Sequence, residues 1–487
     1  MFYISPWYDE IYTYINFIDE GFLYSATHWP APNNHIFFSM LSALINWCGN
    51  YIGLRGISYL AAIGTIIILY IFLKEIFSKN VSMITTLCYS MLLLTNKLAI
   101  QGRGYSLATF FLMVAVYCGY RICYKNVTKK EYIFWMLSLW FGLYTVVTSV
   151  YWVVAICLCC GIVLLILKKY NCLLKLILSS LIAAVMTLLS YAVMWFSIGA
   201  QQISNDVTSG YYGAKVWFLI KEFPRTCLMR GIEFMTSDRS VQGIERSAFL
   251  RDFKYFARDI LSAFFGTTNM WYFYGLLVVI SICFVTLLVL VFRKKNKHIF
   301  MLTLSSVGFF GIFIILCIQS AYPFTRVFSF LGIFIIMPIG LLNGLVAEII
   351  NKFVKWKHFN IVAYIFVGVF ALYTGIKLMS PLYRMEYDVY DYYAYDAVKH
   401  IEWDNVGTYL VSDVYVTQQV EFHQIIGNDI ELQVETDAPD IIITKKTTLT
   451  GVWPDVITDE ALENCFISKR PILYENELYR VYGNNYN

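Results

Sequence analysis

Ten separate apolar runs, each long enough to cross a lipid bilayer, occupy most of the first 380 residues of this chain. They cover residues 54–77, 81–98, 104–124, 131–149, 150–167, 173–196, 271–292, 298–319, 323–346 and 359–380. Inside a bilayer each segment must satisfy its own backbone hydrogen bonds, so runs of this length predict membrane-spanning helices. The composition agrees, because 59% of the residues are hydrophobic and only 14% are charged. We therefore expect an α-helical polytopic membrane protein, which excludes a soluble globular protein.

Lysine and arginine gather in alternate connections between these runs. The basic clusters are Lys74 and Lys79; Lys125, Lys129 and Lys130; Lys168 and Lys169; Arg293, Lys294, Lys295 and Lys297; and Lys352, Lys355 and Lys357. The intervening connections at 101–104 and 319–323 carry little charge. Short loops rich in Lys and Arg stay in the cytoplasm. Residues 1–53, the loop 197–270 and the tail 381–487 are therefore all predicted on the outer face.

The tail 381–487 differs from the membrane domain 54–380 in both charge and pattern. It has seven Lys and Arg against nineteen Asp and Glu, a net charge of −12, whereas the rest of the chain carries +16. A helix-like run at 392–401 precedes β-type runs at 407–413, 429–434, 440–446 and 471–482. We expect a small C-terminal α/β soluble domain outside the membrane. No block of basic residues suggests nucleic acid as a partner.

The segment SPWYDEIYTYINFIDEGF (5–22) places acidic residues close to the membrane. A helical repeat puts apolar side chains on one face (Trp7, Ile11, Tyr14, Ile18 and Phe22) and polar ones on the other (Asp9, Thr13, Asn16 and Glu20). Ser5 is expected to cap this helix, with Pro6 at its first position. Such a helix lies in the membrane interface with its carboxylates turned to water or to a cavity. The plain alternative is a solvated polar face without a function.

A second apolar segment, HIFFSMLSALINWCG (35–49), is too short to cross the membrane. Counting it as a span would also invert every later loop against the distribution of positive charge. Polar residues recur along it at helical spacing, at His35, Ser39, Ser42 and Asn46. We therefore predict a second interfacial helix that packs near the first.

Three arginines, Arg55, Arg103 and Arg326, lie at the outer ends of predicted spans, where the charge rule disfavours cations. Each of them alone could reach to lipid headgroups without any other role. All three, however, share the side that holds Asp9 and Glu10. The planar guanidinium group fits phosphate oxygens in a bidentate way. Carboxylates and arginines at the outer boundary of the membrane therefore suit a reaction on a lipid phosphate.

Five motifs occur in a fixed order: the early Asp-Glu pair, PNNHIFF (32–38), LRGISYLAAIG (54–64), QGRGYSLATFFL (101–112) and YPFTRVFSFLGIFIIMP (322–338). In this order and topology the membrane domain resembles the GT-C glycosyltransferases. More narrowly, it is similar to the bacterial relatives of protein O-mannosyltransferases and to the lipid A aminoarabinose transferase. The outer loop and the soluble tail also fit that family.

The resemblance implies an inverting enzyme of the bacterial plasma membrane whose active site and C-terminal domain are extracytoplasmic. It would move a sugar from a polyprenyl-phosphate donor to a hydroxyl of a glycan, lipid or protein acceptor, in cell-surface glycan assembly. Asp9 matches the family's catalytic acidic position and would act as general base, and Glu10 matches the neighbouring acid. Arg55, Arg103 and Arg326 match arginines near the donor phosphate, whose developing charge they would stabilise.

Three further residues are candidates for contacts with the acceptor or a metal ion: His35, Asn34 and Tyr105. A divalent metal ion is the one cofactor considered, with Asp9 and His35 as its candidate ligands and Glu10 as a residue that would orient Asp9 or the metal. The PNNHIFF segment stands where relatives often have a Pro-Pro-Leu or Glu-Lys-Pro-Pro run. The twelve cysteines are scattered, mostly inside apolar runs, where small buried hydrophobic side chains are the usual explanation, so structural zinc is not expected.

The family's members have a transmembrane helix before the acidic segment, whereas this chain begins at MFYIS, already at that segment. We expect either that this helix is missing from the reading frame or that the protein is a shortened member. Two other functions remain open. A lipid-linked glycan transporter predicts an inverted repeat and ionisable residues at mid-bilayer, and neither is seen in the sequence. A polysaccharide polymerase or ligase would carry a large outer loop with arginines but would not need the early Asp-Glu pair or the tail.

Overall fold

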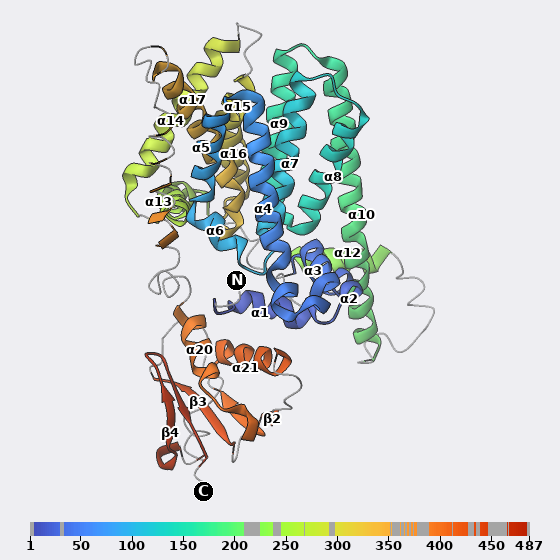
Figure 1. Ribbon diagram of the computed structural model, residues 1–487. Coiled ribbons are helices and arrows are strands. Elements are labelled where there is room, and N and C mark those ends of the chain that lie inside the picture. Colours follow the sequence, from blue (N-terminus) through green and yellow to red (C-terminus); the bar gives the residue numbers. More distant parts are fainter. Residues whose placement is uncertain are drawn as a thin grey trace.

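In the computed structural model, a bundle of long helices carries a small α/β unit at one of its ends (Figure 1). The structure describes residues 4–29, 34–208, 225–236, 245–266, 268–291, 298–350, 389–411, 413–426, 433–434, 439–446, 465 and 467–484, together with single residues between 352 and 376.

Within these residues, seven helical segments are long and apolar enough to cross a membrane. They are α4 (Asn50–Ile76), α7 (Tyr105–Tyr124), η3 with α9 (Val147–Ser149, Val150–Ile166), α10 (Tyr170–Thr208), α14 (Met270–Val291), α15 to α16 through η5 (Ile299–Thr303, Leu304–Gly308, Phe309–Gln319), and η6 with α17 (Thr325–Phe330, Leu331–Ile349). The pair α5 (Lys79–Ser90) and α6 (Leu93–Ala99) makes an eighth if its 70° bend is counted as a break in one span. Together with α8 (Lys129–Thr145), these helices coincide with nine of the ten predicted spans. The predicted span at 359–380 lies largely outside the described residues.

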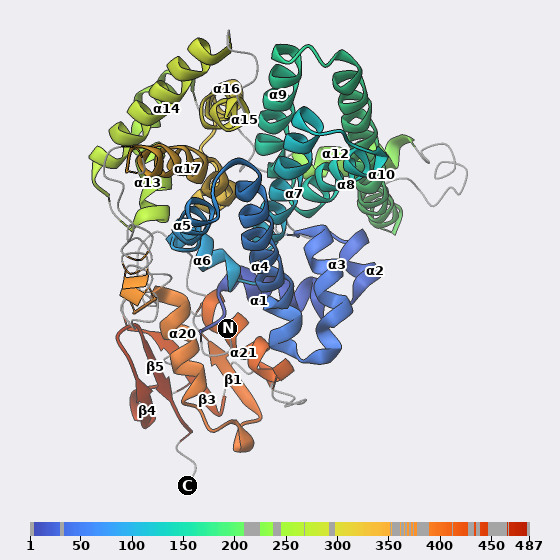
Figure 2. The same cartoon turned by 45° about the horizontal axis from the view of Figure 1, so that its top comes forward.

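The N-terminal segment forms short helices at one end of the bundle, as Figures 1 and 2 both show. They are α1 (Tyr8–Thr13), which continues as the π-turn η1 (Tyr14–Ile18), α2 (Phe22–Thr27) and α3 (Ile36–Ile45). The predicted second interfacial helix is therefore present as α3. Ser39 and Ser42, two of the polar residues that recur along it, are fully buried, so its polar face packs against protein.

The predicted outer loop 197–270 is more helical than the sequence suggested. α10 has 39 residues, which at 1.5 Å per residue is about 58 Å, nearly twice the thickness of the hydrocarbon core. Residues 197–208 therefore belong to α10, which extends past the bundle at the end that holds α1 to α3 (Figure 1). Two further helices, α12 (Arg225–Thr236) and α13 (Arg246–Phe265), lie in the same stretch. The sequence predicted a loop there because 197–270 separates the apolar runs 173–196 and 271–292.

The basic connections that the structure describes, at residues 74–79, 125–130 and 168–169, lie at the other end of the bundle, whereas Arg293, Lys294, Lys295, Lys297, Lys355 and Lys357 lie outside the described residues. α4 and α7 both begin beside the N-terminal helices and run away from them, and their far ends meet in an ion pair between Lys125 Nζ and Glu75 Oε2 at 2.7 Å. Lys74 lies in the last turn of α4. The N-terminal helices and these three described basic connections are thus separated by the length of the bundle, as the charge pattern predicted.

The tail contains a five-stranded sheet in the order β2-β1-β3-β5-β4. β1 (Thr408–Val411) pairs in parallel with β2 (Gln433–Val434) and β3 (Ile441–Lys445), while β5 (Tyr479–Tyr482) pairs antiparallel with β3 and β4 (Ile472–Glu475). The predicted helix is α20 (Val389–Lys399), and the run 471–482 forms a hairpin. A parallel pair needs a crossover connection, and α21 (Val414–Ile426), which the sequence did not predict, supplies the one between β1 and β2.

Candidate active site

The acidic helix α1 begins later than the sequence predicted. Trp7, not Ser5, is its N-cap, and the Trp7 backbone N–H donates to Glu10 Oε2 at 2.9 Å. The predicted apolar face is correct for Ile11, Tyr14 and Ile18, which are all fully buried. The short π-helix η1, which starts at Tyr14, changes the number of residues per turn. Glu20 is consequently exposed rather than aligned with Asp9.

Glu10 forms a buried bidentate ion pair with Arg55 of α4. Arg55 Nε lies 2.8 Å from Glu10 Oε1, and Arg55 Nη2 lies 2.9 Å from Glu10 Oε2. The backbone N–H of Gly102 donates to Oε1 at 2.5 Å. Both side chains are only 1% exposed. We had expected the carboxylates of this helix to face water or a cavity, and for Glu10 that was wrong: the carboxylate faces protein, where a guanidinium and two backbone N–H groups replace water.

The remaining donors of Arg55 also bind the chain itself. Nη1 donates to the Ile4 carbonyl at 2.9 Å, and Nη2 donates to the Ser5 carbonyl at 3.2 Å. Arg55 thereby connects the residues before α1, and α1 itself, to α4. Its contacts fit a structural role better than the predicted contact with a donor phosphate.

The QGRG turn before α7 depends on its two glycines. A Cβ on Gly102 would meet the Leu54 carbonyl oxygen at 2.6 Å, and one on Gly104 would meet Thr145 at 2.7 Å and His35 Nδ1 at 3.0 Å. This close approach brings the N–H of Gly102 to Glu10 and that of Gly104 to His35 Nδ1, the latter at 2.8 Å. The turn thereby fixes both side chains from its backbone.

Arg103, between these glycines, is buried beneath α1. Its Nη1 donates to Thr13 Oγ1 at 2.7 Å and to the Asp9 carbonyl at 3.2 Å, and its Nη2 lies 3.2 Å from His35 Nε2. The ring of Tyr105 meets the His35 ring edge-on with 4.7 Å between centroids. The predicted residues Asp9, Arg103, His35 and Tyr105 are therefore brought together.

His35 is held as a neutral side chain. Burial lowers the pKa of His35 well below its usual value, and the positive charges of Arg103 and Arg326 lower this pKa further. Asn34, the residue before it, orders the loop: its Nδ2 donates to the Ser25 carbonyl at 2.8 Å, and its Oδ1 accepts from Ser39 Oγ at 3.0 Å. Asn34 thus positions His35 rather than facing a substrate.

Asp9 forms the second ion pair of α1, with Arg326 of η6. Asp9 Oδ2 and Arg326 Nη2 are 3.0 Å apart, and the two side chains are 12% and 27% exposed. The Arg326 guanidinium lies between two aromatic rings, 4.7 Å from the Trp7 centroid and 4.3 Å from that of Phe324. The aromatic rings hold the cation in place and leave it partly exposed, whereas Asp9 is buried, so this pair is enclosed on its acid side and less enclosed than the Glu10 pair on its arginine side.

The arrangement does not fit a metal site. Among the described residues, no group of three or more His, Cys, Asp and Glu side chains could hold a metal ion. Guanidinium groups lie against both candidate ligands, Arg326 against Asp9 and Arg103 against His35. These side chains supply the positive charge that a metal ion would otherwise bring.

The tail packs on the outer surface of α1 through α21. Gln419 Nε2 donates to the Pro6 carbonyl at 3.0 Å. The rings of Tyr8 and Tyr415 lie 5.4 Å apart, and those of Tyr14 and Phe422 lie 5.5 Å apart. The tail therefore covers one side of α1, and residues more than 400 positions apart in the sequence are in contact there.

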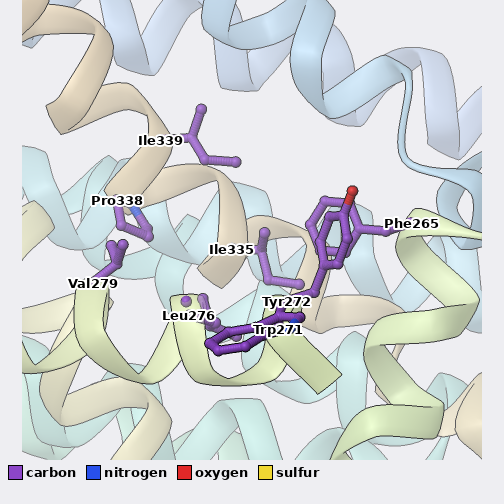
Figure 3. Close-up of a pocket in the computed structure, with 9 residues that line it drawn as sticks. Phe265, Trp271, Tyr272, Leu276, Val279, Ile335, Pro338 and Ile339 are labelled. Carbon is purple, nitrogen blue, oxygen red and sulfur yellow. The ribbon is translucent and has the colours of Figure 1, made fainter. Parts of the chain in front are cut away.

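An apolar cavity of about 370 Å³ lies between α14 and α17. Figure 3 shows side chains of α14 facing Ile335, Pro338 and Ile339 of α17, with Phe265 of α13 beside Tyr272. Among its lining residues none is charged. α17 continues directly from η6, which carries Arg326.

Several contributors to this site were not found from the sequence. Trp7 and Phe324 flank Arg326, Thr13 accepts from Arg103, and Gln419 comes from the tail. The local signals were the helical repeat that placed Thr13 on the face of Asp9 and the spacing of Phe324 and Arg326 in one turn. Nothing in the sequence near Gln419 indicates a contact with α1.

No protein-family model matches the chain, and no curated protein matches its sequence. The structure is similar to the crystal structure of ArnT from Cupriavidus metallidurans bound to undecaprenyl phosphate, with a TM-score of 0.54 at 10% sequence identity over 99% of this chain and 94% of that chain. The apo crystal structure of the same protein aligns over 98% of this chain and 93% of that chain, with a TM-score of 0.38 at 9% identity. The first likeness shows a shared fold, the GT-C fold that the sequence predicted.

Proposed function

We propose that this protein is a membrane glycosyltransferase that moves a sugar from a polyprenyl-phosphate donor to an acceptor hydroxyl, with inversion. The observation that carries the proposal is the ion pair between the buried Asp9 and the partly exposed Arg326, beside Arg103 and His35, at one end of a GT-C bundle. A carboxylate suits proton removal, and guanidinium groups suit a leaving phosphate. The undecaprenyl phosphate bound to ArnT supports a polyprenyl phosphate as the lipid.

In the proposed reaction, the acceptor oxygen attacks the anomeric carbon of the sugar while Asp9 takes the hydroxyl proton. The bond between the anomeric carbon and the phosphate oxygen breaks, and its electron pair leaves with the polyprenyl phosphate. Arg326, freed from Asp9 as the proton arrives, then neutralises the charge that develops on the phosphate. A single displacement of this kind inverts the anomeric centre.

The apolar cavity between α14 and α17 offers a place for the isoprenoid chain. Ile335 follows Arg326 by nine residues, through the 3₁₀ helix η6, in which Phe328 departs from helical geometry, and the start of α17. A phosphate at Arg326 would thus lie at the start of the segment that leads to an apolar wall among spanning helices, with its lipid tail directed along α17. This arrangement matches the amphipathic shape of a polyprenyl phosphate.

The proposed orientation places the site and the tail outside the cytoplasm, in the plasma membrane of a bacterium. The separation of the N-terminal helices from the basic connections supports it. A reporter fused after Asn487 is expected to be active only in its outside-reporting form. Reporter activity in the cytoplasm would contradict the orientation.

The direct test is sugar transfer from purified polyprenyl-phosphate sugars by the purified full-length protein in proteoliposomes. A parallel arm measures flipping of the same lipids without an acceptor, because a lipid-linked glycan transporter would flip without transfer. We expect sugar transfer and a product with an inverted anomeric centre. A chelator should not lower the transfer activity, because two arginines supply the positive charge. Flipping without transfer would overturn the proposed function.

A further inference from the structure

Two polar side chains of the segment QGRGY (101–105) have no hydrogen-bond partner among the residues that the structure describes. Gln101 precedes the glycine that donates to Glu10, and Tyr105 is the first residue of α7. The two residues are only 4% and 5% exposed. Within the described chain, nevertheless, neither the Gln101 carboxamide nor the Tyr105 hydroxyl makes a hydrogen bond or an ion pair. Buried polar groups are nearly always hydrogen-bonded, so both groups require a partner from outside the chain.

Both residues lie at the candidate active site. The Arg103 backbone N–H donates to the Gln101 carbonyl at 2.8 Å, which closes a three-residue turn with Gly102 at its centre. The Tyr105 ring is held edge-on against His35, with 4.7 Å between the ring centroids. The turn that brings Arg103 beneath α1 therefore carries an unpaired amide at its start and leads directly to an unpaired hydroxyl.

The chemistry of these two groups favours one kind of ligand. A carboxamide and a phenol hydroxyl each both donate and accept hydrogen bonds. An ionised phosphate oxygen only accepts them, and a metal ion binds only lone pairs. A sugar hydroxyl, in contrast, donates and accepts, so it can satisfy both capacities of either group. Gln101 and Tyr105 therefore suit a ligand with several hydroxyl groups better than a phosphate or a metal ion.

We infer that Gln101 and Tyr105 bind hydroxyl groups of the sugar on the polyprenyl-phosphate donor and so determine which sugar is transferred. The inference rests on the proposed function, in which the donor phosphate lies at the arginines of the site and the sugar is joined directly to that phosphate. An acceptor would approach from the outer face, whereas both side chains are almost fully buried. Tyr105, which the sequence suggested as a contact for the acceptor or a metal ion, is thus assigned to the donor.

The test compares lipids with and without a sugar, in the absence of any acceptor. The purified full-length protein in nanodiscs is titrated with undecaprenyl phosphate, undecaprenyl phosphate glucose and undecaprenyl phosphate mannose, and binding is followed by intrinsic tryptophan fluorescence. Gln101→Met and Tyr105→Phe each remove one polar group and keep most of the side-chain volume. We expect each variant to bind the preferred sugar lipid about three- to tenfold more weakly, the range for one uncharged hydrogen bond. Binding of undecaprenyl phosphate should not change.

Monodeoxy forms of the preferred sugar lipid give a second readout, which a purely structural role would not change. Removing the hydroxyl that Gln101 binds should weaken binding to the unaltered protein but cause no further loss in Gln101→Met, because both changes remove the same bond. Two variants serve as matched controls and should bind every lipid as the unaltered protein does. They are Gln201→Met, at an exposed glutamine of α10, and Tyr117→Phe, at a tyrosine of α7 whose hydroxyl accepts from Arg121.

Three results would overturn this inference alone. The first is unchanged binding of the preferred sugar lipid by both variants, and the second is an equal loss of binding for undecaprenyl phosphate, which would mean that the two groups support the fold. The third is a further loss in the variants with every monodeoxy lipid. If the unaltered protein prefers neither sugar lipid to undecaprenyl phosphate, the inference fails as well. No binding of undecaprenyl phosphate by the unaltered protein would overturn the proposed function together with it.

Discussion

Asp9 and Glu10 are neighbours in one helix, yet their surroundings are opposite. Glu10 is closed: its carboxylate and the guanidinium of Arg55 are each 1% exposed, and backbone N–H groups bind the same carboxylate. The Asp9 pair is less enclosed: the Asp9 side chain is buried at 12% exposure, but that of Arg326 is 27% exposed, and aromatic rings rather than backbone groups hold the arginine. Adjacent side chains point about 100° apart on an α-helix, which is why one acid meets α4 and the other meets η6.

The difference separates two uses of an ion pair. A buried pair with every oxygen bound fixes the position of a helix and cannot change partners cheaply. A partly exposed pair, whose arginine is held by flat rings, can exchange its carboxylate for a phosphate. Glu10 therefore places α1 so that Asp9 can react, and the predicted roles of the two acids are not equivalent.

The largest effect should come from breaking the closed pair. Glu10→Gln leaves the Arg55 guanidinium buried without a counter-charge, which we expect to lower the free energy of unfolding by about 3–5 kcal/mol. The measurement is the unfolding midpoint of the detergent-solubilised protein. Glu20→Gln, an exposed acid of the same segment, is the control and should change stability by no more than about 0.5 kcal/mol.

Replacing both partners sharpens this test. Glu10→Met combined with Arg55→Met removes the charge pair as a unit, so the double variant should be more stable than the sum of the single losses implies. Additive losses would mean that the two side chains stabilise the protein independently. A Glu10→Gln protein that melts like the unaltered one would remove the structural role of Glu10.

Removing the arginine of the Asp9–Arg326 pair should lower the transfer rate rather than the stability of the fold. Arg326→Ala is expected to lower the transfer rate by about 10²–10³, the usual effect of removing one group that stabilises developing charge. Arg326→Lys should recover only part, because the bidentate fork is lost. The control is Arg258→Ala, an arginine of α13 paired with Asp259 at the surface. If both alanine variants transfer at the unaltered rate, Arg326 only reaches to lipid headgroups.

The smallest effect concerns the tail. Gln419→Met removes the hydrogen bond to the Pro6 carbonyl just before α1, a bond worth about 0.5–1.5 kcal/mol. We expect at most about a tenfold fall in kcat and only a small fall in the unfolding midpoint. A loss as large as that of Arg326→Ala would mean that the tail touches the reacting groups.

The sequence predicted those parts of the site that local sequence patterns determine, and it did not predict those that depend on tertiary packing. Hydropathy and charge alternation are local signals, and they predicted helices at nine of the ten proposed spans and the end of the bundle at which Asp9, Glu10 and the arginines meet. Which arginine pairs with which acid depends on the packing of α4 and η6 against α1, which no local pattern encodes. The same holds for the π-turn at Tyr14 and for Gln419, whose partner lies 413 residues away.

The central claim is that Asp9 takes part in the reaction, whereas Glu10 stabilises the fold. The most direct measurement is the single-turnover rate of sugar transfer by Asp9→Asn and Glu10→Gln, each at an equal amount of folded protein. Asp9→Asn keeps shape and hydrogen bonding but cannot take a proton, so its rate should fall by at least about 10². Per folded molecule, Glu10→Gln should stay within about tenfold of the unaltered rate, because its loss is in folding. Near-normal transfer by folded Asp9→Asn, or a hundredfold slower transfer by folded Glu10→Gln, would contradict the claim.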